Sequence, residues 1–192
     1  FDPRRVFSGI RRDVLKNFDA ACAEAKMLGR LKVPAWGANT MRPEFSFLSG
    51  LEPESLGVHR FNPYRRLARR PIRALPAVLR EAGYATSCIH PHPARFFRRD
   101  RAFPNLGFER FIDGRYFRQA KKTGPYVSDE AVIDKLLAEL AEVETPAFYF
   151  VITMENHGPL HLERFQHSEE RDLMESELSK DCNDLGVYLR HL

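Results

Sequence analysis

Thr40 is the residue of this chain whose type and place could make it a nucleophile. It lies in the stretch GANTMRPEF, between a flexible glycine and the first turn of an expected helix. A hydroxyl there can cap the helix by accepting a backbone N–H, or it can attack a phosphorus whose oxygens are held by the same N–H groups. Spacing alone favours the cap, because serine and threonine are common caps and a threonine nucleophile at neutral pH needs a metal ion.

Two histidines follow apolar stretches that read as strands. His157 comes after AFYFVIT and before a Gly-Pro turn, and His90 ends the stretch YATSCIH. Either could be an ordinary loop residue. Beside an anionic substrate, His157 could donate a hydrogen bond to a phosphoryl oxygen or protonate a leaving alkoxide. His92, between two prolines, is predicted to be exposed and to take no part.

The run FFRRDR places three arginines after two phenylalanines. Helical spacing turns Arg99 away from Arg98 and Arg101, so one or two of the three at most would enter a site. The aromatic residues would suit the wall of a pocket for a glycerol or sugar group. The alternative is a core aromatic pair beside a solvated basic face.

The elements that must position these residues alternate in type. Hydrophobic periodicity predicts helices over 11–28, 43–51, 72–82, 94–104, 128–142 and 168–190, and strands over 29–34, 84–90, 108–112 and 147–153. This alternation predicts an α/β fold with a mostly parallel sheet flanked by helices, in one domain over residues 1–192. Ligands of such sheets bind at the carboxyl ends of the strands, so Thr40, His90 and His157 are expected at one edge.

Composition and charge narrow the function classes. With 43% hydrophobic and 29% charged residues, the chain is an ordinary folded protein, and it has no apolar run of membrane-spanning length. Its three cysteines are too far apart for a disulfide framework or a zinc site and are expected to be buried.

The net charge of +4 is unevenly distributed along the chain. Residues 60–118 carry 14 arginines against four acids, whereas residues 129–192 carry 15 acids against five basic residues. The basic stretch indicates an anionic partner, or else a solvated face paired with the acidic C-terminal third. Nucleic acid is disfavoured, since no recognised motif interleaves the basic residues with exposed aromatic ones.

Three stretches in order, GANTMRPEFSFLSGL, GYATSCIHPHPARFFRRDRAFPNLGFERFID and FYFVITMENHGPL, resemble the lipoteichoic acid synthase-like phosphoglycerol transferases of the alkaline phosphatase/sulfatase superfamily. The resemblance implies that Thr40 is the covalent nucleophile and a metal ligand. It implies that Phe97 and Arg99 hold the phosphoglycerol group, that His157 binds substrate and that His90 is a further pocket histidine.

The implied protein is an extracytoplasmic enzyme of the cell envelope that depends on a divalent metal (Mn, Zn or Mg). It would transfer phosphoglycerol or phosphoethanolamine from a phospholipid or other phosphodiester donor to a cell-envelope or capsular glycan, through a phospho-threonine intermediate. Any membrane association is expected through segments outside these residues. The chain begins at Phe1 rather than Met and ends within an expected helix. We therefore expect a fragment of the catalytic domain, incomplete at both ends, whose other metal ligands lie elsewhere and which is inactive without them.

Two departures from the family pattern leave other readings open. Phe97 stands where the lipoteichoic enzymes usually have tryptophan, and Thr40 stands where a sulfatase needs a cysteine or serine for formylglycine. The threonine argues against sulfate ester hydrolysis, although a phosphodiester or sulfate ester hydrolase of the same superfamily stays an alternative. A non-catalytic module that binds acidic glycan or lipid is the alternative from another class.

Overall fold

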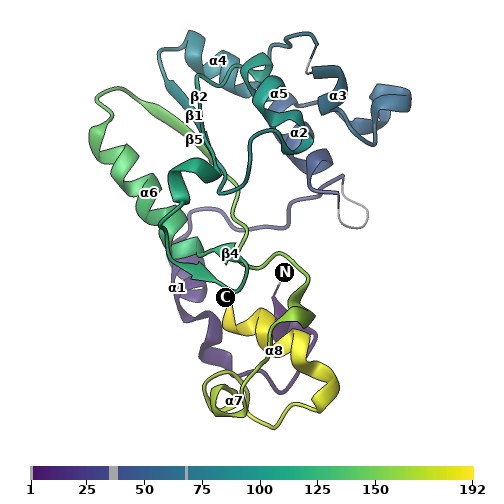
Figure 1. Ribbon diagram of the computed structural model, residues 1–192, viewed down its shortest axis with the longest axis vertical. Coiled ribbons are helices and arrows are strands. Elements are labelled where there is room, and N and C mark those ends of the chain that lie inside the picture. The colour runs from purple at the N-terminus through teal and green to yellow at the C-terminus, as the bar shows by residue number, and fades with distance from the viewer. Residues whose placement is uncertain (1, 35–38, 68) are drawn as a thin grey trace. The chain divides into compact units, whose positions relative to one another are not determined.

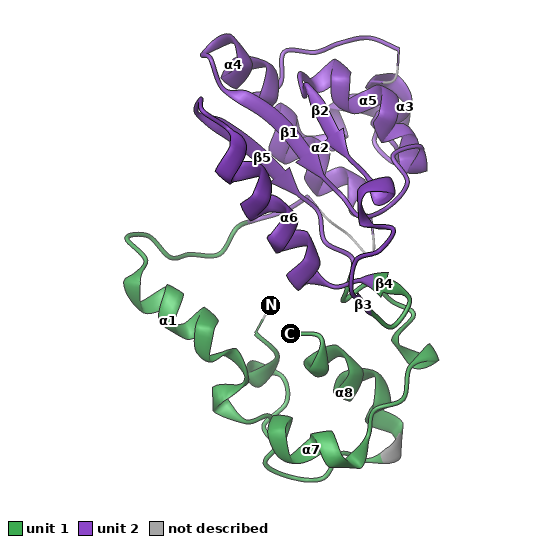
Figure 2. Ribbon diagram, turned by 60° about the vertical axis from the view of Figure 1, so that its left-hand side comes forward, with its two compact units in different colours: residues 1–31, 123–126, 155–192 green, residues 32–122, 127–154 purple. Residues whose placement is uncertain are grey.

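The computed structural model describes residues 2–34, 39–67 and 69–192, which divide into two compact units (Figure 2). The sheet unit comprises residues 32–122 and 127–154, and the helical unit comprises residues 1–31, 123–126 and 155–192. Within the described residues no helix is both long and apolar enough to cross a bilayer.

Short helices and strands alternate along the chain (Figure 1). The α-helices are α1 (Lys16–Glu24), α2 (Met41–Ser49), α3 (Tyr64–Leu67), α4 (Leu75–Glu81), α5 (Arg99–Leu106), α6 (Asp129–Glu142), α7 (His167–Leu173) and α8 (Asn183–Arg190). The strands are β1 (Ala85–Ile89), β2 (Arg110–Ile112), β3 (Lys122–Thr123), β4 (Tyr126–Val127) and β5 (Ala147–Val151).

The sheet unit is built around three parallel strands in the order β2-β1-β5. Successive side chains of a strand point to opposite faces, so Cys88 and Phe150 lie on one face and Ile89 and Val151 on the other. The first face packs against α2, α3 and α5, and the second against α6, as the ribbon in Figure 1 shows. The predicted α/β class with a parallel sheet flanked by helices is confirmed.

Several elements begin or end at residues whose types favour that role. Ser128 caps α6 by accepting a hydrogen bond from the Ala131 N–H at 3.2 Å, and Gly83, with φ of 88°, follows α4. Gly107, with φ of 105°, ends α5, and a side chain there would collide with the backbone of Ala77. That position therefore needs glycine both for its backbone angle and for the close approach of α4.

Other predicted elements were wrong. Residues 29–34 form no strand, and a 3-10 helix (Pro53–His59) and α3 lie between the helices predicted over 43–51 and 72–82, where none was predicted. The single helix expected over 168–190 is two, because Met174 is extended and pairs with Ile10 in an isolated β-bridge. β5 packs side chains against the cores on both of its faces, yet all five of its residues are only half-buried, because within the described sheet it is an edge strand that pairs with β1 alone.

Candidate functional site

Thr40 immediately precedes α2 and makes no capping hydrogen bond. Its backbone is already helical, with φ of −52° and ψ of −36°, and its carbonyl oxygen accepts from the N–H of Glu44 at 3.1 Å. A cap residue normally has an extended backbone so that its side chain can turn back to the first turn. The exposed Thr40 hydroxyl therefore does not cap α2, which is the role that its place in the sequence favoured.

Arg99 is held in the interior of the sheet unit by a carboxylate. Its Nη2 lies 2.6 Å from Oε1 of Glu44 and its Nε 3.2 Å from Oε2, with only 2% of Arg99 and 5% of Glu44 exposed. The hydroxyl of Tyr64 donates to the same Oε2 at 2.7 Å. Burial raises the pKa of Tyr64 well above its usual range, and the Glu44 charge adds to that shift, so Tyr64 stays a donor.

One nitrogen of the Arg99 guanidinium is left open. Nη1 is buried and has no hydrogen-bond partner among the described residues. A buried donor without a partner costs about 1–3 kcal/mol, so such an atom is suited to an acceptor that a ligand brings. The Phe97 ring lies 5.2 Å from the guanidinium carbon and forms the neighbouring wall.

A strained turn separates Arg99 from the arginine before it. Phe97 and Arg98 have φ of 55° and 58°, in the left-handed region that residues with a side chain seldom adopt. This turn leaves Arg98 exposed and directs Arg99 inward, while Arg101 is exposed on α5. As predicted, the Arg99 side chain points away from those of Arg98 and Arg101, and it is the buried one of the three.

His90 follows β1 and is buried. Its Nδ1 lies 3.0 Å from the carbonyl oxygen of Ile152, just after β5, so Nδ1 is the donor in that bond. His92 is half-buried between the rings of His90 and Phe96, at centroid distances of 5.7 and 4.7 Å. The prediction that His92 is exposed was wrong, because the turn after β1 folds it against its neighbours, and its taking no part in function stays a prediction.

Within the sheet unit, the structure links the predicted residues through direct contacts. Glu44, which binds Arg99, comes four residues after Thr40 in α2, and residues with that spacing share a helix face about 6 Å apart along the axis. The Phe97 ring lies 4.1 Å from the Phe96 ring at a tilt of 42°, and ring contacts continue from Phe96 through His92 to His90. The sequence predictions gave no role to Glu44 or Tyr64. Glu44 could have been noticed because it is an acid on the otherwise apolar face of α2.

His157 belongs to the helical unit, and its described contacts lie there. Its side chain is exposed, its Nδ1 is 2.7 Å from the carbonyl oxygen of Gly158, and its ring meets that of Tyr126 edge-on at 5.7 Å. The preceding Asn156 is anchored by a 3.2 Å hydrogen bond from Nδ2 to the carbonyl oxygen of Tyr188 in α8. The loop is therefore held at both sides of the histidine.

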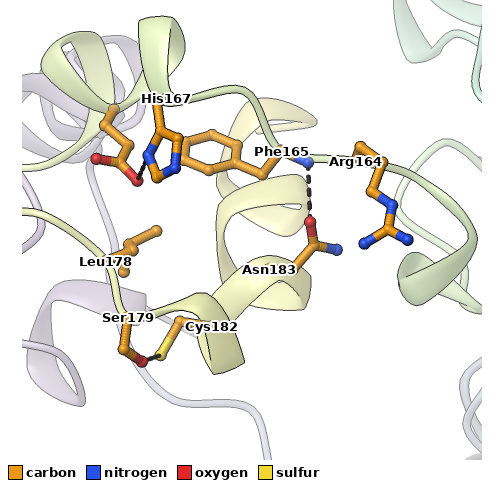
Figure 3. A pocket seen from close by; sticks show the side chains of 8 residues that line it. Arg164, Phe165, His167, Leu178, Ser179, Cys182 and Asn183 are labelled. Carbon is orange, nitrogen blue, oxygen red and sulfur yellow. Dashed lines mark hydrogen bonds and ion pairs between the residues drawn. The ribbon is translucent and has the colours of Figure 1, made fainter.

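The helical unit also contains a pocket of about 290 Å³, shown in Figure 3. His167 Nδ1 lies 3.0 Å from Glu170 Oε1 on one side, and Ser179 Oγ lies 3.3 Å from Cys182 Sγ on the other. None of the residues predicted from the sequence lines this pocket, and the groups that do are largely bound to one another. It is not the candidate site.

Comparison with known proteins settles the family. The sequence profile of the sulfatase family matches residues 14–192. The chain belongs to the sulfatase family. Among relatives of this sulfatase-family chain is the capsular polysaccharide biosynthesis protein RkpI of Rhizobium meliloti (strain 1021), 37% identical over 155 residues. The match covers 79% of this chain but only 29% of RkpI.

Two solved structures resemble this sulfatase-family chain. The phosphoglycerol transferase GacH of Streptococcus pyogenes, in complex with sn-glycerol-1-phosphate, has a TM-score of 0.73 at 25% identity and covers 99% of this chain and 50% of that one. The lipoteichoic acid synthase LtaP of Listeria monocytogenes has a TM-score of 0.72 at 22% identity. The match covers 93% of this chain and 42% of LtaP. The family match and the likeness to GacH confirm the resemblance on which the sequence predictions rested, and the likeness to LtaP shows a shared fold.

The residues described for this sulfatase-family chain do not fit a metal site. Nowhere in 2–34, 39–67 and 69–192 do three histidine, cysteine or acidic side chains gather in a way that could hold an ion. The Thr40 hydroxyl alone cannot, since such sites rely on charged or strongly donating ligands. The divalent metal stays a prediction.

The cysteines of this sulfatase-family chain offer no second nucleophile in the sheet unit. Cys88 is buried in β1, and burial raises the pKa of its thiol well above the usual range, so it stays protonated. Cys22 and Cys182 are half-buried, so the prediction that all three are buried was wrong for these two.

Proposed function

We propose that this chain is part of a phosphotransferase that modifies cell-envelope or capsular glycans at the extracytoplasmic side of the cell. The observation that carries the proposal is an uncapped, exposed Thr40 one helical turn before Glu44, the residue that binds the buried Arg99 and leaves its Nη1 open. A phosphoryl group near Thr40 would provide the acceptor that this nitrogen lacks.

The proposed reaction is a double displacement. Thr40 Oγ attacks the phosphorus of a phosphodiester donor and gives up its proton to solvent, and the donor oxygen leaves with the electron pair of the broken P–O bond and takes up a proton to become an alcohol. The resulting phospho-threonine is then attacked by a glycan hydroxyl, which releases Thr40. Arg99 binds a non-bridging oxygen as negative charge develops. The family resemblance alone implies that His157, from the helical unit, donates to the transferring group or protonates the leaving oxygen. His90 and Phe97 shape the pocket.

The names of the relatives support the substrate class. GacH is described as a phosphoglycerol transferase and RkpI as a capsular polysaccharide biosynthesis protein. A phosphoglycerol donor and a glycan acceptor suit both descriptions. Threonine at position 40, where formylglycine formation needs cysteine or serine, disfavours sulfate ester hydrolysis despite the family's name. Water as the acceptor would turn the same site into a phosphodiesterase.

Mass spectrometry tests the proposal directly. The full-length protein, incubated with phosphatidylglycerol and Mn²⁺ without an acceptor, should acquire a phosphoglycerol adduct on the peptide that contains Thr40. Adding a glycan acceptor should discharge the adduct into a phosphorylated glycan rather than into free glycerol phosphate. An active preparation without an adduct would rule out the covalent route, and a preparation with neither adduct nor turnover would favour the binding module.

Exchange of arginine for lysine distinguishes Arg99 from its neighbours. Lysine keeps the charge but cannot bind Glu44 and a phosphoryl oxygen at the same time through a planar fork. We expect Arg99→Lys to raise KM for the donor roughly ten- to a hundredfold, which corresponds to one charge-assisted hydrogen bond of about 1.5–3 kcal/mol. Arg98→Lys and Arg101→Lys, at exposed positions, are the matched controls. Equal effects of all three on KM would indicate a diffuse basic surface instead.

A further inference from the structure

Five arginines within eleven residues form an exposed basic segment in the sheet unit. Arg60, Arg65, Arg66, Arg69 and Arg70 are exposed, and within the described residues none of them forms an ion pair. The predicted solvated basic face is therefore present at these five positions. We call residues 58–67 and 69–70 the arginine segment.

The fold directs this charge outward. Tyr64 and Leu67 of α3 are buried in the core with α5, so Arg65 and Arg66 between them lie on the opposite side of the helix. Figure 1 shows α3 at the outer edge of the sheet unit, beyond α5 as seen from the strands. No acid occurs in the sequence between Glu54 and Glu81, so nothing local offsets the positive charge.

Two apolar side chains project from the same segment. Val58 is 87% exposed and Phe61 is 60% exposed, and the guanidinium of Arg60 lies 4.8 Å from the centre of the Phe61 ring. Exposed apolar residues among cations are the composition of a surface that binds a lipid interface, with the cations at the head groups and the apolar groups at the acyl boundary. A soluble polyanion would engage the arginines but offer Val58 no apolar environment.

The arginine segment is attached to the turn that carries Thr40. Asn39, the residue before Thr40, donates from Nδ2 to the carbonyl oxygen of Phe61 at 3.3 Å. A lipid surface that contacts Phe61 would therefore lie next to the proposed nucleophile. We propose that the arginine segment docks the sheet unit onto an anionic phospholipid membrane. Docking does not depend on the chemistry proposed above, although it would bring a lipid donor to Thr40.

Vesicle co-sedimentation tests this docking without measuring turnover. The purified protein is mixed with phosphatidylcholine vesicles, with or without phosphatidylserine, which supplies negative charge but not the phosphoglycerol group of a donor. Each basic residue at an anionic surface contributes about fivefold to binding, and the effect is screened by salt. We expect binding only to the phosphatidylserine vesicles, and weaker binding as the salt concentration rises.

Paired variants assign the binding to the segment. Arg65→Gln with Arg66→Gln should weaken binding about 25-fold, because two charges are removed. Arg80→Gln with Arg118→Gln removes the same charge at exposed positions outside the segment and should have little effect. Val58→Ser with Phe61→Ser should remove the vesicle binding that persists at raised salt concentration. Far-UV circular dichroism verifies that each variant is folded.

Three results would overturn the proposal. The first is equal binding to neutral and anionic vesicles, or none to either. The second is an equal loss from the two pairs of arginine variants, which would indicate diffuse charge. The third is binding to soluble heparin that needs Arg65 and Arg66 but not Val58 and Phe61, together with no vesicle binding, which would make the partner an acidic glycan. A protein without transferase activity can still pass this test.

Discussion

Replacing Thr40 with alanine should abolish turnover and leave stability almost unchanged. The hydroxyl is exposed and makes no capping hydrogen bond, so its loss should alter the free energy of unfolding by no more than about 0.5 kcal/mol. Loss of a covalent nucleophile lowers kcat by roughly 10⁴- to 10⁶-fold. Donor turnover by the full-length protein and a thermal unfolding curve measure the two quantities side by side.

The control for that experiment is Thr40→Ser, which retains a hydroxyl at the same backbone position. We expect the serine variant to keep measurable turnover and to form the covalent adduct, while the alanine variant does neither. Wild-type turnover by Thr40→Ala would show that the hydroxyl takes no part in the chemistry. A large loss of stability in Thr40→Ala would instead give Thr40 a structural role.

Replacing Glu44 with glutamine should destabilise the protein more than any other single change considered in the site. Glutamine leaves Arg99 buried without a counter-charge, and breaking a buried ion pair in this way costs about 3–5 kcal/mol. For a chain of this size that corresponds to a fall in Tm of roughly 10 °C. Differential scanning calorimetry or chemical denaturation checks it.

The same helix region provides a matched control. Arg42 Nη2 and Glu54 Oε1 are also 2.6 Å apart, but the Glu54 side chain is 61% exposed, whereas that of Glu44 is 5% exposed. Exposed pairs contribute about 0–1 kcal/mol, so Glu54→Gln should scarcely shift Tm. Similar shifts for the two variants would mean that burial does not strengthen the Glu44–Arg99 pair, and Arg99 would then have no rigid support for binding a phosphoryl group.

Sequence patterns predicted the parts of the fold that short-range forces determine. The Ser128 cap, the glycine after α4 and the apolar stretch of β5 are all written within a few residues of the feature that they specify. The break at Met174 was not, because it depends on pairing with Ile10, more than 160 residues earlier. Likewise, the apolar face predicted for α1 is not buried in the helical unit, and Phe18 is 57% exposed.

In the candidate site, too, features set by local sequence could be predicted, whereas features set by long-range contacts could not. Thr40 and Arg99 could be identified because motif order and helical spacing are local properties of the sequence. The partner of Arg99 could not, since Glu44 is 55 residues away and the contact exists only once α2 and α5 pack together. The positions of His157 and of the metal ligands relative to Thr40 stay predictions, because His157 lies in the helical unit and the described residues contain no metal cluster.

The left-handed backbone of Phe97 and Arg98 should affect which substitutions are tolerated at these two positions. A left-handed backbone costs a residue with a side chain roughly 1–2 kcal/mol, a cost that glycine and, in part, asparagine avoid. At position 98 the side chain is exposed, so substitution by glycine or asparagine would relieve strain without removing a buried side chain. At position 97 the same exchange would remove the ring beside Arg99. Neutral variation among homologues should therefore accumulate at position 98, while selection retains an aromatic residue at position 97 despite its strained backbone.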